Sequence, residues 1–300
     1  MLLRGALTIM DNVKTAEFAL KGASGINCLF SDVEVGGIRF RCVNGVLVGE
    51  FKLGSEDSER AWDVAWERAG LLVIALSLVS GCGFETCCVS VDSCMVVNVP
   101  ISASFTVGLG QAPEQMTGMP TMYMPTTIQV SVGKAINLDK EILDEAVKLM
   151  DKLKDALQSS DPNKRRVVDG LLRAVKWWVS GSLDEDPLDG FLKFFIAFEM
   201  LASLKGYKGK NKEKGKKRKN KDHEEESGGS WVEDFCKKYG LTCKFEGKRV
   251  NEVRNSIMHK PGEKREEAEG VARRHADEFG REVLRAIWRV LSEELGVGMD

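Results

Sequence analysis

The chain has 300 residues, of which 43% are hydrophobic and 29% are charged, and its formal net charge is -2. This composition is typical of globular proteins and argues against a chain that is disordered or membrane-embedded throughout. Since the net charge is so small, only its distribution can indicate a partner. The most apolar run, residues 71–79, is about half of the roughly 20 residues that a bilayer span needs. Without a signal-like N-terminus, we expect a cytoplasmic protein with no membrane partner.

Residues 1–135 are predicted to form a mixed α+β domain, whose role the sequence does not indicate. Asn44-Gly45 predicts a tight hairpin, because both residues tolerate a positive φ. One helix is expected over residues 56–80, packed on the sheet, and a surface loop over residues 110–125. The candidate strands are rich in Val, Ile, Phe and Thr, and they cover residues 17–21, 38–43, 46–53, 86–91, 95–99, 102–107 and 127–132.

The eight cysteines are predicted to be mainly small, buried thiols of an intracellular protein. Four of them, Cys82, Cys87, Cys88 and Cys94, cluster in one strand-rich stretch. Their spacing lacks the paired ligands of a typical zinc site, and adjacent residues of a strand point to opposite faces. A disulfide and a metal site are the two alternatives to free thiols. Because free thiols are the favoured interpretation, we expect no bound metal and no cofactor.

From residue 138 the spacing of apolar side chains changes from two to about 3.6, which predicts an all-α bundle over residues 138–300. Asp161-Pro162 and Asp186-Pro187 each predict a helix start, with aspartate as N-cap and proline in the first turn. The aromatic residues that follow Asp186-Pro187 are predicted to be core. The last helix is expected over residues 263–295.

A basic low-complexity segment interrupts this bundle at about residues 205–230. Its composition predicts disorder, because it cannot bury enough apolar surface to offset the entropy of ordering. One interpretation is a solvated loop without further role. The other is a flexible arm that binds the phosphates of RNA through Lys216, Lys217, Arg218 and Lys219.

A compact set of polar residues, Arg254, Asn255 and His259, lies on a predicted short helix over residues 252–260. Asn255 and His259 share a face because they are four residues apart, whereas Arg254 lies about 140° from His259. The other two histidines, His223 and His275, are expected to be solvated.

These side chains suit the cleavage of RNA. An imidazole can take the proton of a ribose 2′-hydroxyl, and a guanidinium can hold the scissile phosphate. Because the 2′-oxygen is an internal nucleophile, the reaction needs no metal. Its products would be a 2′,3′-cyclic phosphate and a 5′-hydroxyl, and DNA would not be cut.

The Arg-Asn-x3-His pattern of residues 254–259 resembles the R-x4–6-H signature of HEPN domains, and FLKFFIAFEML at residues 191–201 resembles their Apea-like branch. The resemblance covers roughly residues 140–295. It implies a metal-independent endoribonuclease of defence or toxin systems that acts as a homodimer. Carried over, Arg254 would bind the phosphate, Asn255 would position it, and His259 would be the acid–base group. Glu199 matches an acidic position that would orient Arg254.

The sequence therefore predicts an α+β fold, with RNA as the partner of the helical part and Lys260 as a further RNA contact. A regulatory protein partner is also expected. Two alternatives stay open: a module that binds RNA or a protein without turnover, and a purely structural role for Arg254 and His259 within the bundle.

Overall fold

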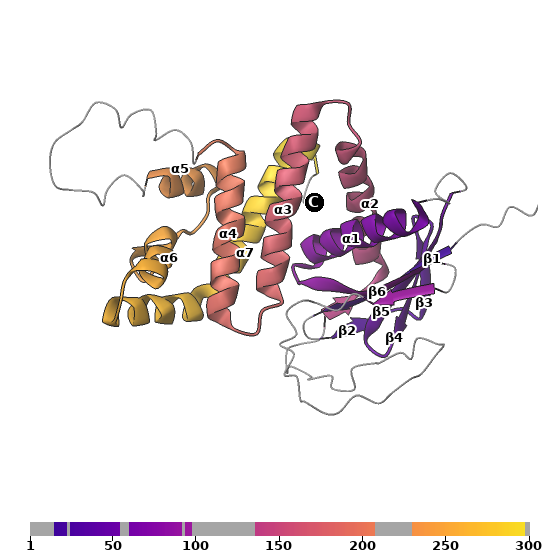
Figure 1. Ribbon diagram of the computed structural model, residues 1–300, viewed down its shortest axis with the longest axis horizontal. Helices are drawn as coiled ribbons and strands as arrows, with labels where there is room; N and C mark the ends of the chain where they lie inside the picture. Colours follow the sequence, from indigo (N-terminus) through magenta and orange to yellow (C-terminus); the bar gives the residue numbers. More distant parts are fainter. Residues whose placement is uncertain are drawn as a thin grey trace, which may run out of the picture.

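The computed structural model describes residues 15–22, 25–54, 60–91, 94–97, 136–207 and 230–297. The strands expected at residues 102–107 and 127–132, the loop at 110–125 and the basic residues Lys216, Lys217, Arg218 and Lys219 lie outside these ranges. Within them, an antiparallel sheet with one covering helix precedes a helical region (Figure 1). The predicted α+β class is confirmed.

The sheet has six strands in the order β3-β4-β5-β1-β6-β7, and every neighbouring pair is antiparallel. Asn44 and Gly45 have φ values of 51° and 76°, which confirms the predicted hairpin between β4 and β5. The short strands β2 and β8 pair in parallel beside this sheet. The strands are β1 (Thr15–Gly22), β2 (Ile26–Cys28), β3 (Asp32–Val35), β4 (Ile38–Val43), β5 (Val46–Lys52), β6 (Phe84–Val91), β7 (Cys94–Val97) and β8 (Ile136–Leu138).

Helix α1 (Ala61–Ser80) lies on this sheet, as predicted. It is apolar on nearly all sides because α2 (Lys140–Leu157) covers it from the other side. At the end of α1, the hydroxyl of Ser77 accepts a hydrogen bond of 3.1 Å from the backbone N–H of Phe84, the first residue of β6. The apolar face of α2 packs against α1 and so belongs to the core of the N-terminal part.

The remaining helices are α3 (Pro162–Ser182), α4 (Pro187–Leu204), α5 (Ser230–Tyr239), α6 (Val250–His259) and α7 (Glu263–Leu295). Both predicted Asp-Pro starts are confirmed: Asp161 accepts a hydrogen bond from the N–H of Asn163, and Asp186 accepts one from Leu188. Helices α3, α4 and α7 pack against one another around buried aromatic rings. The bounds of α7 coincide with those predicted.

The sheet layer and the bundle share one continuous core. The indole N–H of Trp288 on α7 donates to the backbone oxygen of Leu78 on α1 over 3.3 Å. Helix α1 also contacts α3. None of the described helices combines the length and apolar character that a bilayer span requires.

Candidate functional site

Helix α6 carries the predicted motif and begins two residues earlier than expected. Val250, Val253 and Ile257 are 0%, 0% and 5% exposed, so one face of the helix is anchored in the core. The backbone N–H of Arg249, the N-cap, donates to the carboxylate of Glu252 over 2.9 Å. The buried apolar face and the N-cap thus fix the position of α6.

Arg254 is half-buried and faces helix α4. Its guanidinium lies over the ring of Phe195, 5.8 Å from the centroid, and Nη1 donates a hydrogen bond of 3.1 Å to Oδ1 of Asn255. Half-buried Glu199 follows Phe195 by one turn of α4. The structure therefore joins Arg254 and Asn255, and an aromatic face and an amide hold the guanidinium in place.

His259 is the last residue of α6 and is exposed. Asn255, one turn earlier, is exposed as well, and exposed Lys260 closes the helix through its backbone N–H, which donates to Ser256. No hydrogen bond joins the His259 ring to another described residue. Its imidazole is therefore exposed at the end of the helix. No described contact brings it to Arg254.

A short hairpin, formed by β9 (Lys244–Phe245) and β10 (Lys248–Arg249), leads into α6. Glu233 of α5 pairs with Arg249 over 2.8 Å and with Lys244 over 3.3 Å. The hydrogen bond from Arg249 and, to a smaller extent, that from Lys244 lower the pKa of Glu233. A disulfide between Cys236 and Cys243 ties α5 to the same hairpin, and the backbone oxygen of Cys243 accepts from the N–H of Val250. The position of α6 thus depends on α5.

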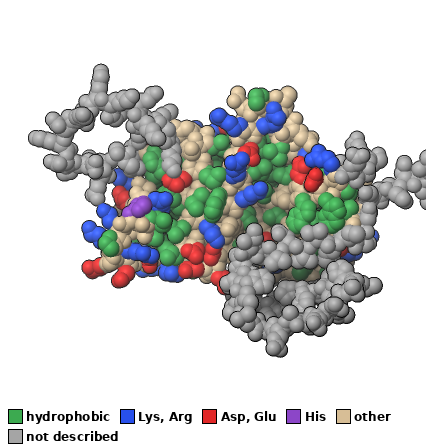
Figure 2. All heavy atoms as spheres, in the orientation of Figure 1, with side chains coloured by type: hydrophobic (Ala, Val, Ile, Leu, Met, Phe, Trp, Pro, Cys, Tyr) green, Lys and Arg blue, Asp and Glu red, His purple; other side chains and the backbone are tan. Residues whose placement is uncertain are grey.

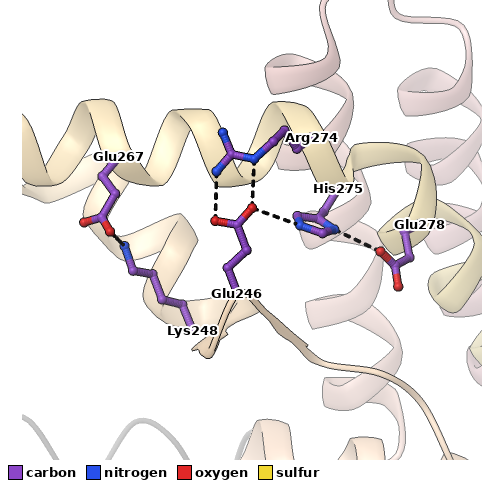
Figure 3. Close-up of polar contacts among 6 residues, drawn as sticks. All are labelled: Glu246, Lys248, Glu267, Arg274, His275 and Glu278. Atoms are coloured by element: carbon purple, nitrogen blue, oxygen red, sulfur yellow. Dashed lines mark hydrogen bonds and ion pairs between the residues drawn. The ribbon is translucent and has the colours of Figure 1, made fainter.

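The other side of the hairpin is held by α7 (Figure 3). Arg274 donates two hydrogen bonds of 2.8 Å to Glu246 at the hairpin turn, and Lys248 pairs with Glu267 over 2.7 Å. His275 lies between two carboxylates, 3.2 Å from Glu246 and 2.9 Å from Glu278.

The prediction that His275 is solvated is therefore wrong. Its ring also stacks on Phe245, with centroids 4.9 Å apart and an interplanar angle of 22°. Both ring nitrogens face carboxylates, so neither is open to take a proton from a substrate. Its partners come from the hairpin turn 29 residues away and from its own helix, and sequence spacing indicates only the second.

The prediction of free thiols is also wrong for four cysteines. Cys28 and Cys42 form one disulfide, with Cα atoms 6.0 Å apart, and Cys236 and Cys243 form another, with Cα atoms 6.3 Å apart. Cys28 and Cys42 lie on the different strands β2 and β4, whereas Cys236 lies on α5 and Cys243 directly before β9, so the packing of these elements brings each pair together. Cys82, Cys87 and Cys88 are free, and burial raises the pKa of Cys87 to about 11.

Comparisons with protein-family models, curated proteins and solved structures give no match. The resemblance to HEPN domains thus rests on the residues of this chain. In the part of the chain that the structure describes, no group of three or more His, Cys, Asp or Glu side chains is arranged to hold a metal ion.

We expect Glu246→Gln to lower the melting temperature at neutral pH, with a difference that shrinks at acid pH. The hydrogen-bonded guanidinium of Arg274 lowers the pKa of Glu246 from 4.5 to about 2. A depressed pKa contributes stability above the unfolded-state value, and this stability is lost as the pH falls from 4.5 towards 2. Melting curves of both proteins across this range test the expectation, and a constant difference would contradict it.

We expect the double substitution Cys236→Ser and Cys243→Ser to reduce the free energy of unfolding by about 2.5 kcal/mol, the loop-closure value for a short loop. The two cysteines are seven residues apart. Urea denaturation without reductant measures the loss, with Cys82→Ser as a control because Cys82 is free. Equal stability of the double variant and the wild type would show that the disulfide contributes nothing.

Proposed function

We propose that the chain is a metal-independent endoribonuclease in which Arg254 and His259 act on RNA. The observation that carries the proposal is the arrangement of α6, with an exposed imidazole at its end. A guanidinium held by Phe195 and Asn255 precedes this imidazole by five residues. The two groups are separated by about 7.5 Å along the helix axis. His259 thus supplies a base for a 2′-hydroxyl, and Arg254 supplies a fixed cation for a phosphate.

The proposed reaction is a transesterification. His259 takes the proton of the 2′-hydroxyl as the 2′-oxygen attacks the adjacent phosphorus. The bond from phosphorus to the 5′-oxygen breaks, and that oxygen receives a proton from a second acid–base group. Arg254 neutralises the charge that develops on the non-bridging oxygens, and Asn255 positions the guanidinium. The products are a 2′,3′-cyclic phosphate and a 5′-hydroxyl.

The proposed active form is a homodimer. Within one chain, Arg254 and His259 differ by about 140° in helical phase, and no described contact joins them. Two copies facing each other would place an Arg254 opposite a His259 and supply the second acid–base group. Met258, which is 53% exposed beside His259, provides apolar surface for such a contact. Sedimentation at the assay concentration tests this point, and an active monomer would contradict it.

The proposed location is the cytoplasm, where RNA is available, and a regulatory protein or a signal would act through the N-terminal part. A defence or toxin role follows from the HEPN resemblance. In a reducing cytoplasm the Cys28–Cys42 and Cys236–Cys243 pairs would be thiols. Imaging of the tagged protein tests the location. Exposed Lys260 beside His259, together with Lys216, Lys217, Arg218 and Lys219, would contact RNA phosphates.

The deciding experiment incubates the purified chain with end-labelled RNA in excess EDTA. Fragments with 2′,3′-cyclic phosphate and 5′-hydroxyl ends, together with intact DNA of the same sequence, are expected. RNA that is bound but not cut would favour the binding module. Neither binding nor cutting would favour a protein-interaction role, with Arg254 and His259 serving the bundle alone.

A further inference from the structure

One face of helix α3 combines basic side chains with an exposed tryptophan. Trp177 is 39% exposed, and it is the one aromatic residue among the large exposed hydrophobic side chains of the described chain. Arg173 lies one turn before it and Arg166 three turns before it, and Lys176 precedes it directly. All four are exposed. At about 100° per residue they fall within an arc of about 100° on the helix. We call these four residues the α3 basic face.

The net charge of helix α3 is positive, whereas that of the whole chain is negative. Helix α3 contains five basic residues and one acidic residue, Asp169, whereas the chain has a net charge of -2. Figure 2 shows Lys and Arg side chains along the upper part of this helix. Asp169 pairs with Arg173 over 2.8 Å, but the two side chains are 55% and 66% exposed. Such an exposed pair contributes little, so a phosphate can replace the carboxylate.

The two adjacent tryptophans of α3 differ in their environment. Trp178 is 2% exposed, and its indole N–H donates to the backbone oxygen of Gly280 over 2.8 Å, so it belongs to the core. Trp177 points away from that core, and no ring or cation contact covers it among the described residues. An indole face of this kind can stack on a planar, apolar-faced ligand such as a nucleic-acid base.

We propose that the α3 basic face binds single-stranded RNA, with Trp177 stacked on a base and Arg166, Arg173 and Lys176 on phosphates. This inference rests on the proposed function for its ligand. Arg166 and Trp177 are about 16 Å apart along the axis, a length that covers several nucleotides. The face has a single apolar side chain, which is too little to bury in a lipid surface. Stacking together with a basic track is the usual recognition of unpaired strands.

The α3 basic face and α6 lie on different sides of α4. Helix α4 contacts both α3 and α6, and it runs between them in Figure 1. RNA bound along α3 therefore has to cross α4 before its backbone reaches Arg254 and His259. We infer that the α3 basic face binds the part of the RNA that lies away from the scissile bond. Substitutions on this face should therefore weaken the binding of long RNA and leave the binding of a dinucleotide unchanged.

The test measures fluorescence anisotropy of a labelled, unstructured 20-nucleotide RNA in EDTA. The protein carries His259→Ala so that no RNA is consumed. Trp177→Ala is expected to raise Kd about tenfold, the loss of one stacked base. Arg166→Glu with Arg173→Glu is expected to weaken binding further and to reduce the salt dependence of log K by about 1.4, the value for two phosphate contacts. Melting temperatures confirm that each variant is folded.

The matched control is Lys148→Glu with Lys152→Glu, which makes the same charge change on exposed positions of α2. Unchanged Kd in the α3 variants, equal weakening in the α2 control, or no RNA binding at all would overturn the inference. If the wild type cleaves RNA but the α3 substitutions do not change Kd, the proposed nuclease function is retained and the α3 basic face is rejected as an RNA-binding surface. If the α3 substitutions weaken binding but the wild type does not cleave RNA, the binding surface is retained and the nuclease function is rejected.

Discussion

Replacing His259 with alanine is expected to slow RNA cleavage by about 10²–10⁴-fold, the contribution of one positioned acid–base group. The fold should be unaffected, because the exposed imidazole makes no hydrogen bond with another described residue and exposed substitutions usually change stability by less than about 0.5 kcal/mol. Single-turnover rates with saturating enzyme measure the effect on the chemical step. Activity within twofold of wild type would remove His259 from the mechanism.

Arg254→Ala is expected to reduce the same rate by about 10²–10³-fold, since it removes the donor that neutralises developing charge in the proposed reaction. Arg254→Lys should recover little of the rate. Lysine keeps the charge but lacks the planar fork that lies over Phe195 and donates to Asn255. Arg265→Ala on α7 is the control, because Arg265 is exposed and, among the described residues, its side chain pairs with Glu269 on its own helix. If Arg265→Ala and Arg254→Ala lost equal activity, a general charge effect would explain both.

Local signals in the sequence were sufficient for the starts of α3 and α4 and for both ends of α7. Asp161 and Asp186 each cap a helix through a side-chain hydrogen bond, and both proline-containing starts lie where predicted. The long amphipathic pattern gave the bounds of α7 without error. Asn44-Gly45 gave the β4–β5 hairpin. In each case the information lies within a few residues of the feature that it determines.

The surroundings of α6 could not be predicted in this way. The ring of Phe195 beneath Arg254 comes from a helix about 60 residues earlier, and its periodicity indicated only a core position. The β9–β10 hairpin turns at Glu246-Gly247, where Glu246 takes a positive φ of 50° that glutamate rarely adopts. Contacts with Arg274 and His275 of α7 hold it there. The sequence therefore indicated which residues form the motif but not what supports them.

Phe198→Ala is expected to cost about 3–5 kcal/mol of unfolding free energy, as for other large aromatic residues removed from a core. Phe198 is 1% exposed, and its ring centroid lies 5.1 Å from that of Phe235 on α5 and 5.8 Å from that of Phe279 on α7. One side chain thus joins α4 to both helices that hold the hairpin. Phe198→Leu, which leaves a smaller cavity, should lose clearly less, and urea denaturation measures both.

The same substitution should loosen α6, although the ring contacts of Phe198 among the described residues lead to α4, α5 and α7. Helix α5 carries Glu233 and Cys236, which position the hairpin before α6, so a loosened α5 leaves the motif less fixed. Phe40→Ala is the control, because Phe40 is also fully buried but lies in the sheet. Amide hydrogen exchange under native conditions should show reduced protection in α6 for Phe198→Ala and not for Phe40→Ala. Equal protection of α6 in the two variants would mean that α6 is held by α4 and α7 alone, without a contribution from α5.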